Sequence, residues 1–236
     1  MSVYVLVHGA FHGGWCFDLL RERLEAEGHT VFAPTLSGVG ERLHLAGTAS
    51  INLATHIAEI ADLIRFRDLE DVVLCGHSYG VMVAAGVADA WSDKIRTVVY
   101  LDGMIPENGD TLFSILPSVV EAFLAQAAAN GGLHVSPFPA AAFGVAEKHQ
   151  AWVDSKLTTH PLACFTQAIS LTGAYKSVPR KLLIYNTTDI GIPTNIPQTY
   201  EAQRGVETVQ VFPLPGGHDL MIDAVDALSD ILLSHA

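Results

Sequence analysis

One short motif in the sequence has the spacing of a nucleophilic serine. Residues 76–80 read GHSYG and fit the pattern G-x-S-x-G, with Ser78 at the centre. The motif follows the apolar run 72–75 and precedes a stretch of small apolar residues, which is the strand-to-helix context of a nucleophile elbow. A helix N-terminus at that turn would also favour negative charge near the hydroxyl. We therefore expect Ser78 to be a catalytic nucleophile.

A serine hydroxyl needs a general base, and His218 is the candidate. It lies in a glycine-bearing segment between the last predicted strand and the last predicted helix. Two aspartates could hold its imidazole in the correct orientation. Asp102 ends a predicted strand, and Asp189 follows the next one, a few residues before Pro193. The residues by themselves leave the choice between these two acids open.

The oxyanion of a tetrahedral intermediate needs hydrogen-bond donors. One candidate is the backbone N–H of Tyr79, the residue after the nucleophile. The other should come from the loop after the first predicted strand, where glycines allow a close backbone approach, and we choose the N–H of Ala10. His8 and His12 also lie in this loop, but the zinc motif H-E-x-x-H is absent. We therefore expect no metal site.

Apolar runs and helical patterns alternate along the chain. Strands that are apolar on both faces and separated by helices indicate a parallel sheet covered on both sides, with sites at the carboxyl ends of its strands. The prediction is one α/β domain, residues 1–236, with six mainly parallel strands. The predicted strands are 3–7, 30–33, 71–75, 95–101, 182–185 and 208–212; the predicted helices are 19–26, 53–64, 79–90 and 220–233; residues 37–50 form a predicted loop.

Residues 104–178 interrupt this alternation, because no strand pattern occurs there. We expect mostly helical excursions that form a cap over the carboxyl edge of the sheet. Apolar side chains of the cap and of the first loop could line a pocket for neutral ligands, although many will simply form the core of the cap. The predicted pocket residues are Phe11, Phe113, Leu116, Phe123, Phe143 and Trp152.

Composition excludes several kinds of partner. The net charge of -12 argues against nucleic acid and against an anionic membrane surface, both of which need basic patches. The three cysteines are widely spaced, which indicates buried thiols rather than a zinc site or a disulfide framework. Neither a signal peptide nor a phosphate-binding glycine motif is present. We expect a cytoplasmic protein without cofactors that acts on a small molecule, and an apolar cap that could support a homodimer.

The motifs together resemble those of the α/β-hydrolase superfamily. Within it, the chain is similar to the plant methylesterase and hydroxynitrile lyase family and to its bacterial esterase relatives. The resemblance covers nearly the whole chain and implies a cofactor-free hydrolase with a serine, a histidine and an acid. One departure is Val81, where relatives usually have glycine. The segments that carry the resemblance are 5–15, 40–42, 76–80, 100–102 and 217–219.

The resemblance also bears on the acid and on the reaction. The most similar bacterial relatives carry Tyr-Leu-Asp at the end of the fourth strand, and many lack an aspartate in the later loop, which favours Asp102 and leaves Asp189 as its rival. Cyanogenic relatives have a lysine beside the catalytic histidine and a threonine in the first loop. Asp219 and Ala10 occupy those positions here, so a lyase is not expected.

We therefore expect a carboxylesterase that cleaves small neutral esters through an acyl-enzyme. A lactonase and a cofactor-independent dioxygenase are alternatives on the same fold. A dioxygenase would tolerate the loss of Ser78 but not that of His218. A ligand receptor with slow turnover is an alternative of another class, because a fold does not fix a function.

Overall fold

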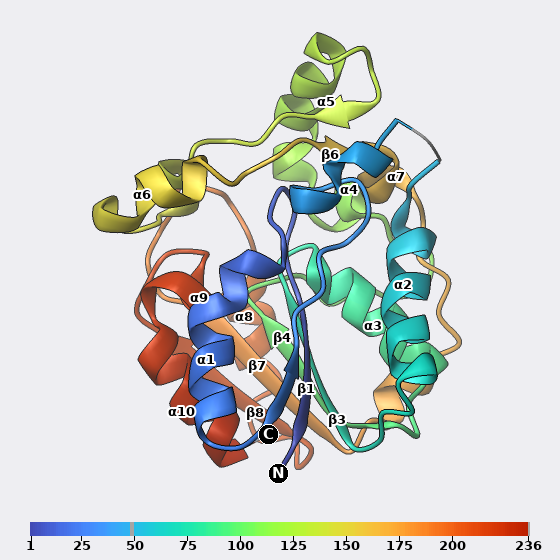
Figure 1. Ribbon diagram of the computed structural model, residues 1–236, viewed down its shortest axis with the longest axis vertical. Coiled ribbons are helices and arrows are strands. Elements are labelled where there is room, and N and C mark those ends of the chain that lie inside the picture. Colours follow the sequence, from blue (N-terminus) through green and yellow to red (C-terminus); the bar gives the residue numbers. More distant parts are fainter. Residues whose placement is uncertain (48–49, 236) are drawn as a thin grey trace.

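The protein is built around a six-stranded sheet in which every neighbouring pair of strands is parallel (Figure 1). The computed structural model describes residues 1–47 and 50–235; residues 48–49 of the predicted loop and residue 236 lie outside the described part. The predicted α/β fold is confirmed. In spatial order the strands are β2 (Thr30–Phe32), β1 (Val3–Val7), β3 (Val72–His77), β4 (Ile95–Leu101), β7 (Arg180–Asn186) and β8 (Val209–Leu214).

Helices cover both faces of this sheet (Figure 1). On one face lie α2 (Leu53–Phe66) and α3 (Gly80–Ala90), and on the other α1 (Asp18–Ala26), α9 (Leu220–Asp223) and α10 (Val225–His235). Every residue of β3 is buried between these layers, which explains its continuous apolar run. The predicted final helix 220–233 is two helices, because Ala224 leaves the helical conformation between them.

Most of the segment 104–178 forms a cap over the carboxyl edge of the sheet (Figure 1). Its last part does not belong to the cap: it runs down beside the helix 80–90, where the N–H groups of Thr172, Gly173 and Tyr175 donate to Asp89 near the end of that helix. The α-helices of the cap are α4 (Leu112–Ile115), α5 (Val120–Ala129), α6 (Glu147–Asp154) and α7 (Ala163–Thr166). The prediction of a cap without strands was wrong in detail, because β5 (His134–Val135) and β6 (His160–Pro161) form an antiparallel pair. Such two-residue strands are too short to give an alternating pattern.

Shorter elements complete the chain. Helix α8 (Ile196–Glu201) connects β7 to β8, and the predicted loop 37–50 contains a 3-10 turn. None of the helices described is long and apolar enough to cross a membrane. The 3-10 segments are Gly14–Phe17, Gly40–Leu45, Pro117–Val119, Ala140–Phe143 and Ala174–Ser177.

The contact between α3 and β1 predicts an effect on stability. A Cβ atom on Gly80 would lie 2.4 Å from the carbonyl oxygen of Val7 and 2.7 Å from that of His8. Neither carbonyl can move aside without separating α3 from the sheet. We expect Gly80→Ala to lower the free energy of unfolding by about 1–3 kcal/mol or more, measured by urea denaturation.

The matched control is Gly47→Ala, because no atom of the described residues 1–47 and 50–235 lies within 4 Å of the corresponding Cβ position. Its free energy of unfolding should stay within about 0.5 kcal/mol of the wild type. If Gly80→Ala and Gly47→Ala lowered the free energy of unfolding equally, the steric explanation would be wrong.

Candidate active site

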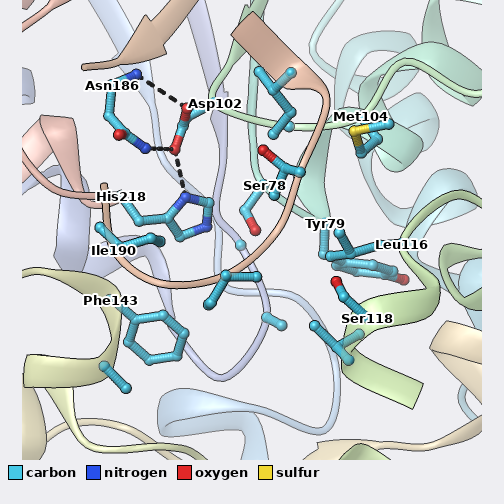
Figure 2. Close-up of a pocket in the computed structure, with 18 of the residues that line it drawn as sticks. Ser78, Tyr79, Asp102, Met104, Leu116, Ser118, Phe143, Asn186, Ile190 and His218 are labelled. Carbon is cyan, nitrogen blue, oxygen red and sulfur yellow. Dashed lines mark hydrogen bonds and ion pairs between the residues drawn. The ribbon is translucent and has the colours of Figure 1, made fainter. Parts of the chain in front are cut away.

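Ser78 occupies a strained turn between β3 and α3. Its φ angle is +53°, in the left-handed region that residues other than glycine rarely adopt. The turn is tight because a Cβ on Gly76 would lie 2.3 Å from the carbonyl oxygen of Gly80. The N–H of Ser78 donates to the carbonyl of Leu101 at 3.0 Å, which ties the turn to β4. This geometry is that of a nucleophile elbow, and Figure 2 shows the Ser78 side chain in the pocket.

His218 and Asp102 form a hydrogen-bonded pair in the same pocket (Figure 2). The distance from His218 Nδ1 to Asp102 Oδ2 is 2.6 Å. Because the carboxylate only accepts, Nδ1 carries the proton, and Nε2 is left to accept one from a hydroxyl. Burial alone would lower the pKa of His218, but the hydrogen bond and the charge of Asp102 raise it above its usual value.

Asn186, at the end of β7, holds Asp102 in place. Its backbone N–H donates to Asp102 Oδ1 at 3.0 Å, and its side-chain amide donates to Oδ2 at 2.6 Å. Burial would raise the pKa of Asp102, which is only 3% exposed, but the bonds from His218 and Asn186 lower it below the usual value. The carboxylate is therefore ionised and fixed in direction.

Asp189, the rival acid, lies elsewhere. It is exposed at the rim of the pocket, and its carboxylate accepts the N–H of Gly191 at 2.8 Å. That bond closes a local turn of a kind that aspartate often makes. The geometry brings Asp102 and not Asp189 to His218.

The two candidate oxyanion donors line the pocket together with Ser78. Ala10 follows β1, and Tyr79 follows the nucleophile. The first loop lies directly against the elbow, since a Cβ on Gly9 would be 2.9 Å from Ser78 Cβ. The loops after β1 and β3 therefore bring Ala10 and Tyr79 to the pocket that holds Ser78, as an oxyanion hole built from two backbone N–H groups would require.

The pocket above these residues has a volume of about 800 Å³. Of the predicted lining residues, Phe11, Leu116, Phe123 and Phe143 do line it. The prediction was wrong for Phe113 and Trp152, which lie outside the lining of the pocket. The ring of Phe113 packs against Phe123 and Phe165, and that of Trp152 packs against Trp15.

Sequence reasoning missed several residues of the site. Asn186 was missed because its partner is 84 residues away, although both residues end neighbouring strands of the predicted sheet. Apart from Asp189, the segment 187–194 that follows β7 was missed, as were several cap residues, because loops carry no periodic signal. The missed lining residues include Met104, Phe138, Thr187, Thr188, Ile190 and Ile192.

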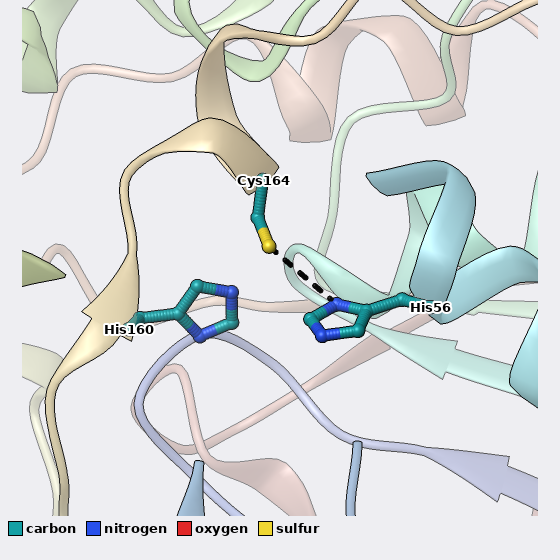
Figure 3. A group of neighbouring side chains, drawn as sticks. All are labelled: His56, His160 and Cys164. Carbon is teal, nitrogen blue, oxygen red and sulfur yellow. Dashed lines mark hydrogen bonds between the residues drawn. The ribbon is translucent and has the colours of Figure 1, made fainter. Parts of the chain in front are cut away.

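A buried group of possible metal ligands lies outside the pocket. Among the residues described, His56, His160 and Cys164 place one ligand atom each within 4.8 Å of one another (Figure 3). His56 fits a ligand role, because its Nε2 donates to the carbonyl of Ser37 at 2.9 Å and its Nδ1 faces the hydroxyl of Tyr79 at 2.9 Å.

His160 does not fit a ligand role. The N–H of Phe11 donates to His160 Nδ1 at 3.3 Å, so the proton of the neutral ring must be on Nε2. Nε2 has no hydrogen-bond partner in the part of the chain that the structure describes, and a metal ion binds only an unprotonated ring nitrogen. The hydrogen bonds therefore oppose a metal ion in this group.

The geometry of the elbow and of the His218 pair is accompanied by a sequence match. A model of the alpha/beta hydrolase family matches residues 4–231. The chain belongs to the alpha/beta hydrolase family. This alpha/beta hydrolase is 37% identical over 242 residues to a carbendazim hydrolyzing esterase from Nocardioides sp. (strain SG-4G), covering 98% of each chain. Methylesterase 4 of Arabidopsis thaliana is 30% identical over 149 residues, which cover 60% of this chain and 56% of that protein.

Solved structures show the same fold. An extracellular alpha/beta-hydrolase from a Paenibacillus species superposes with a TM-score of 0.87 at 20% identity, covering 100% of this chain and 99% of that one. Polyneuridine aldehyde esterase gives a TM-score of 0.75 at 19% identity, covering 99% and 98%. The resemblance to plant methylesterases and bacterial esterases is therefore confirmed.

The pair of His218 and Asp102 predicts a titration that can be measured without a substrate. Asp102→Asn removes the negative charge and leaves burial as the main influence on the imidazole, so the pKa of His218 should fall below its usual value of about 6.5. In the wild type it should lie above that value. Histidine-labelled NMR over pH 5–9 measures both.

The control is Asp189→Asn, which removes an exposed carboxylate that bonds to Gly191. It should leave the titration of His218 unchanged. If Asp189→Asn lowered the pKa of His218 instead, the orienting acid would be Asp189 in the later loop.

Proposed function

We propose that this alpha/beta hydrolase cleaves small, neutral carboxylic esters through an acyl-enzyme. Ser78 is the nucleophile, His218 the base and acid, Asp102 the orienting carboxylate, and the N–H groups of Ala10 and Tyr79 the oxyanion donors. The observation that carries this proposal is the 2.6 Å bond between His218 Nδ1 and Asp102 Oδ2 in the pocket that holds Ser78. The carbendazim hydrolyzing esterase and the plant methylesterases support ester hydrolysis.

The first half of the reaction acylates the serine. Ser78 Oγ attacks the ester carbonyl carbon while its proton moves to His218 Nε2. The carbonyl electron pair moves onto oxygen, and the donors at Ala10 and Tyr79 bind the resulting oxyanion. When the intermediate collapses, the C–O bond to the alcohol breaks, and His218 returns its proton to the leaving alkoxide.

The second half releases the acid. His218 takes a proton from water, whose oxygen attacks the acyl carbon and forms a second oxyanion in the same place. Collapse breaks the bond to Ser78 Oγ, which recovers its proton from His218. The products are one alcohol and one carboxylic acid, and no cofactor is consumed.

The lining of the pocket favours neutral substrates. Its described lining residues include the carboxylates of Asp102 and Asp189 but neither lysine nor arginine. A substrate carboxylate would therefore lose its hydration without gaining a cationic partner. Apolar contacts from Leu116, Phe123 and Phe143 fit an uncharged hydrocarbon or aromatic group.

The direct test is intact-mass analysis after treatment with a fluorophosphonate. The wild type should gain a single adduct, and Ser78→Ala none, because only an activated serine attacks phosphorus readily. Labelling of both proteins, or of neither in folded samples, would refute Ser78 as the activated nucleophile.

Ester turnover should follow the same assignments. We expect Ser78→Ala and Asp102→Asn each to lower kcat by roughly 1,000- to 10,000-fold, because the hydroxyl or the productive imidazole tautomer is lost. Asp189→Asn should stay within about threefold of the wild type. The assay uses a panel of methyl and aryl esters and includes carbendazim, for which the bacterial relative is named.

The charge of the pocket predicts a substrate preference. A neutral methyl ester should have a kcat/KM about tenfold or more above that of an equally long ester with a terminal carboxylate, which corresponds to at least 1.4 kcal/mol. The difference in kcat/KM should become smaller at high salt, because screening weakens the repulsion between the substrate carboxylate and the carboxylates of the pocket. Equal values at low salt would contradict the proposed neutrality of the site.

Two further expectations concern location and assembly. We expect the enzyme in the cytoplasm, because Cys16, Cys75 and Cys164 are buried free thiols, as in reducing compartments. The apolar cap could support a homodimer, but all the proposed site residues come from one chain. Sedimentation measurements with and without substrate would test the assembly.

A further inference from the structure

His8 links two hydrogen bonds directly behind the first oxyanion donor. It follows β1 and is completely buried. The N–H of Leu36 donates to His8 Nε2 at 3.0 Å, so that nitrogen cannot carry a proton. His8 Nδ1 lies 2.8 Å from the carbonyl oxygen of Gly9, and it must be the donor to that oxygen. The ring is therefore fixed as the neutral tautomer with its proton on Nδ1.

Burial keeps this ring neutral. It lowers the pKa of His8 to about 3, well below its usual value. Across the neutral pH range His8 therefore neither gains nor loses a proton. It can donate one hydrogen bond and accept one, which excludes a role as a second general base.

The carbonyl that His8 holds belongs to the peptide of the candidate donor. The C=O of Gly9 and the N–H of Ala10 are the two ends of one planar, trans peptide group. Fixing the direction of the carbonyl therefore fixes the direction of the N–H, which points the opposite way. Because Gly9 packs against Ser78 Cβ and Ala10 lines the pocket, the orientation of this peptide decides whether its N–H can reach an oxyanion.

The next peptide is held just as firmly. The carbonyl of Ala10 accepts a bond from His12 Nδ1 at 2.8 Å, and the N–H of Phe11 donates to His160 Nδ1 at 3.3 Å. His12 Nε2 faces the buried carboxylate of Asp219 at 3.1 Å. The two ring nitrogens of His12 thus contact the carbonyl oxygen of Ala10 and the carboxylate of Asp219.

Asp219, the residue that follows His218, holds His12 in place and so supports the first loop. Burial would raise the pKa of Asp219, but His12 lowers it to about 2, so the carboxylate stays ionised. In the Gly9–Ala10 peptide, Ala10 lines the pocket, and His8 holds the carbonyl of Gly9 at the other end. This places His8 directly behind the donor.

We propose that His8 is a positioning residue for oxyanion stabilisation, which rests on the proposed ester hydrolysis. Its hydrogen bonds run in one direction, from the N–H of Leu36 through the imidazole and the carbonyl of Gly9 to the N–H of Ala10 and the oxyanion. Hydrogen bonds in such a chain polarise one another. His8 therefore both aims the donor at Ala10 and strengthens it when negative charge develops on the substrate oxygen.

The test compares two amides at position 8. In His8→Asn the amide nitrogen stands near the position of Nδ1 and can still donate to Gly9. In His8→Gln it reaches the position of Nε2 and cannot. We expect His8→Gln to lower kcat about tenfold with a nearly unchanged KM, less than the roughly 100- to 1,000-fold cost of deleting a donor outright. His8→Asn should retain most of the activity.

A second substrate separates positioning from general damage. Each variant is assayed with an ester and with the matching thionoester, whose sulfur accepts hydrogen bonds poorly and gains less from the oxyanion hole. His8→Gln should lower the rate of the ester about tenfold more than that of the thionoester. The proposal would be overturned if His8→Gln lowered the rates of ester and thionoester hydrolysis by the same factor. It would also be overturned if His8→Gln and His8→Asn were equally active.

A measurement on the wild type covers the case in which the variants do not fold. Histidine-labelled NMR should show His8 with its proton on Nδ1 throughout pH 5–8. That proton should shift downfield when a trifluoromethyl ketone forms a hemiketal oxyanion on Ser78. A proton on Nε2, or a resonance that does not move, would overturn the assignment of His8.

Fluorophosphonate labelling distinguishes failure of this proposal from failure of the proposed function. The phosphoryl oxygen occupies the same donors, so His8→Gln should be labelled about tenfold more slowly than His8→Asn. If the wild type is labelled but cleaves no ester, the proposed substrate class fails and the labelling rates still test His8. If labelling is equally fast in both variants, the proposal for His8 fails and the proposed function stands.

Discussion

The left-handed turn at Ser78 is the constraint on which the site depends. The loops after β1 and β4 pack closely against it. A Cβ atom added to Gly9 would lie 2.9 Å from Ser78 Cβ, and one added to Gly103 would lie 2.5 Å from the carbonyl oxygen of Ser78. A Cβ atom added to Gly80 would clash with the carbonyl oxygen of Val7 at the end of β1. Because each approach is limited by backbone or Cβ atoms, the positions of the nucleophile, the first loop and the end of β4 are mutually fixed.

Charge in this crowded region is arranged by pairing. Two histidines face buried carboxylates: His218 contacts Asp102, and His12 contacts Asp219. His8 and His77 lack a close carboxylate bond of this kind, and burial lowers the pKa of each to about 3. The carboxylate of Asp102 therefore distinguishes His218, whose pKa is raised, from His8 and His77, which burial keeps neutral.

Much of this architecture could be predicted from the sequence. The strand ends that carry Ser78, Asp102 and His218 were placed correctly, because buried parallel strands leave long apolar runs and their ends meet at one edge. The partners of those residues could not be predicted. His12 and Asp219 are 207 residues apart, and their contact depends on how the last loop folds over the first. Phe113 and Trp152 were misplaced because an apolar residue in a cap is equally suited to its core and to its pocket.

The support of Asp102 by Asn186 has a consequence for how this enzyme could diversify. The acid stands at the end of β4, and the end of β7 contributes only the amide that holds it. The exposed segment 187–194 therefore forms one wall of the pocket without supplying a group to the proposed proton relay. Residues there can be exchanged, lengthened or shortened at little cost to the chemistry. Libraries confined to this segment should change which esters are accepted while the machinery beneath remains intact.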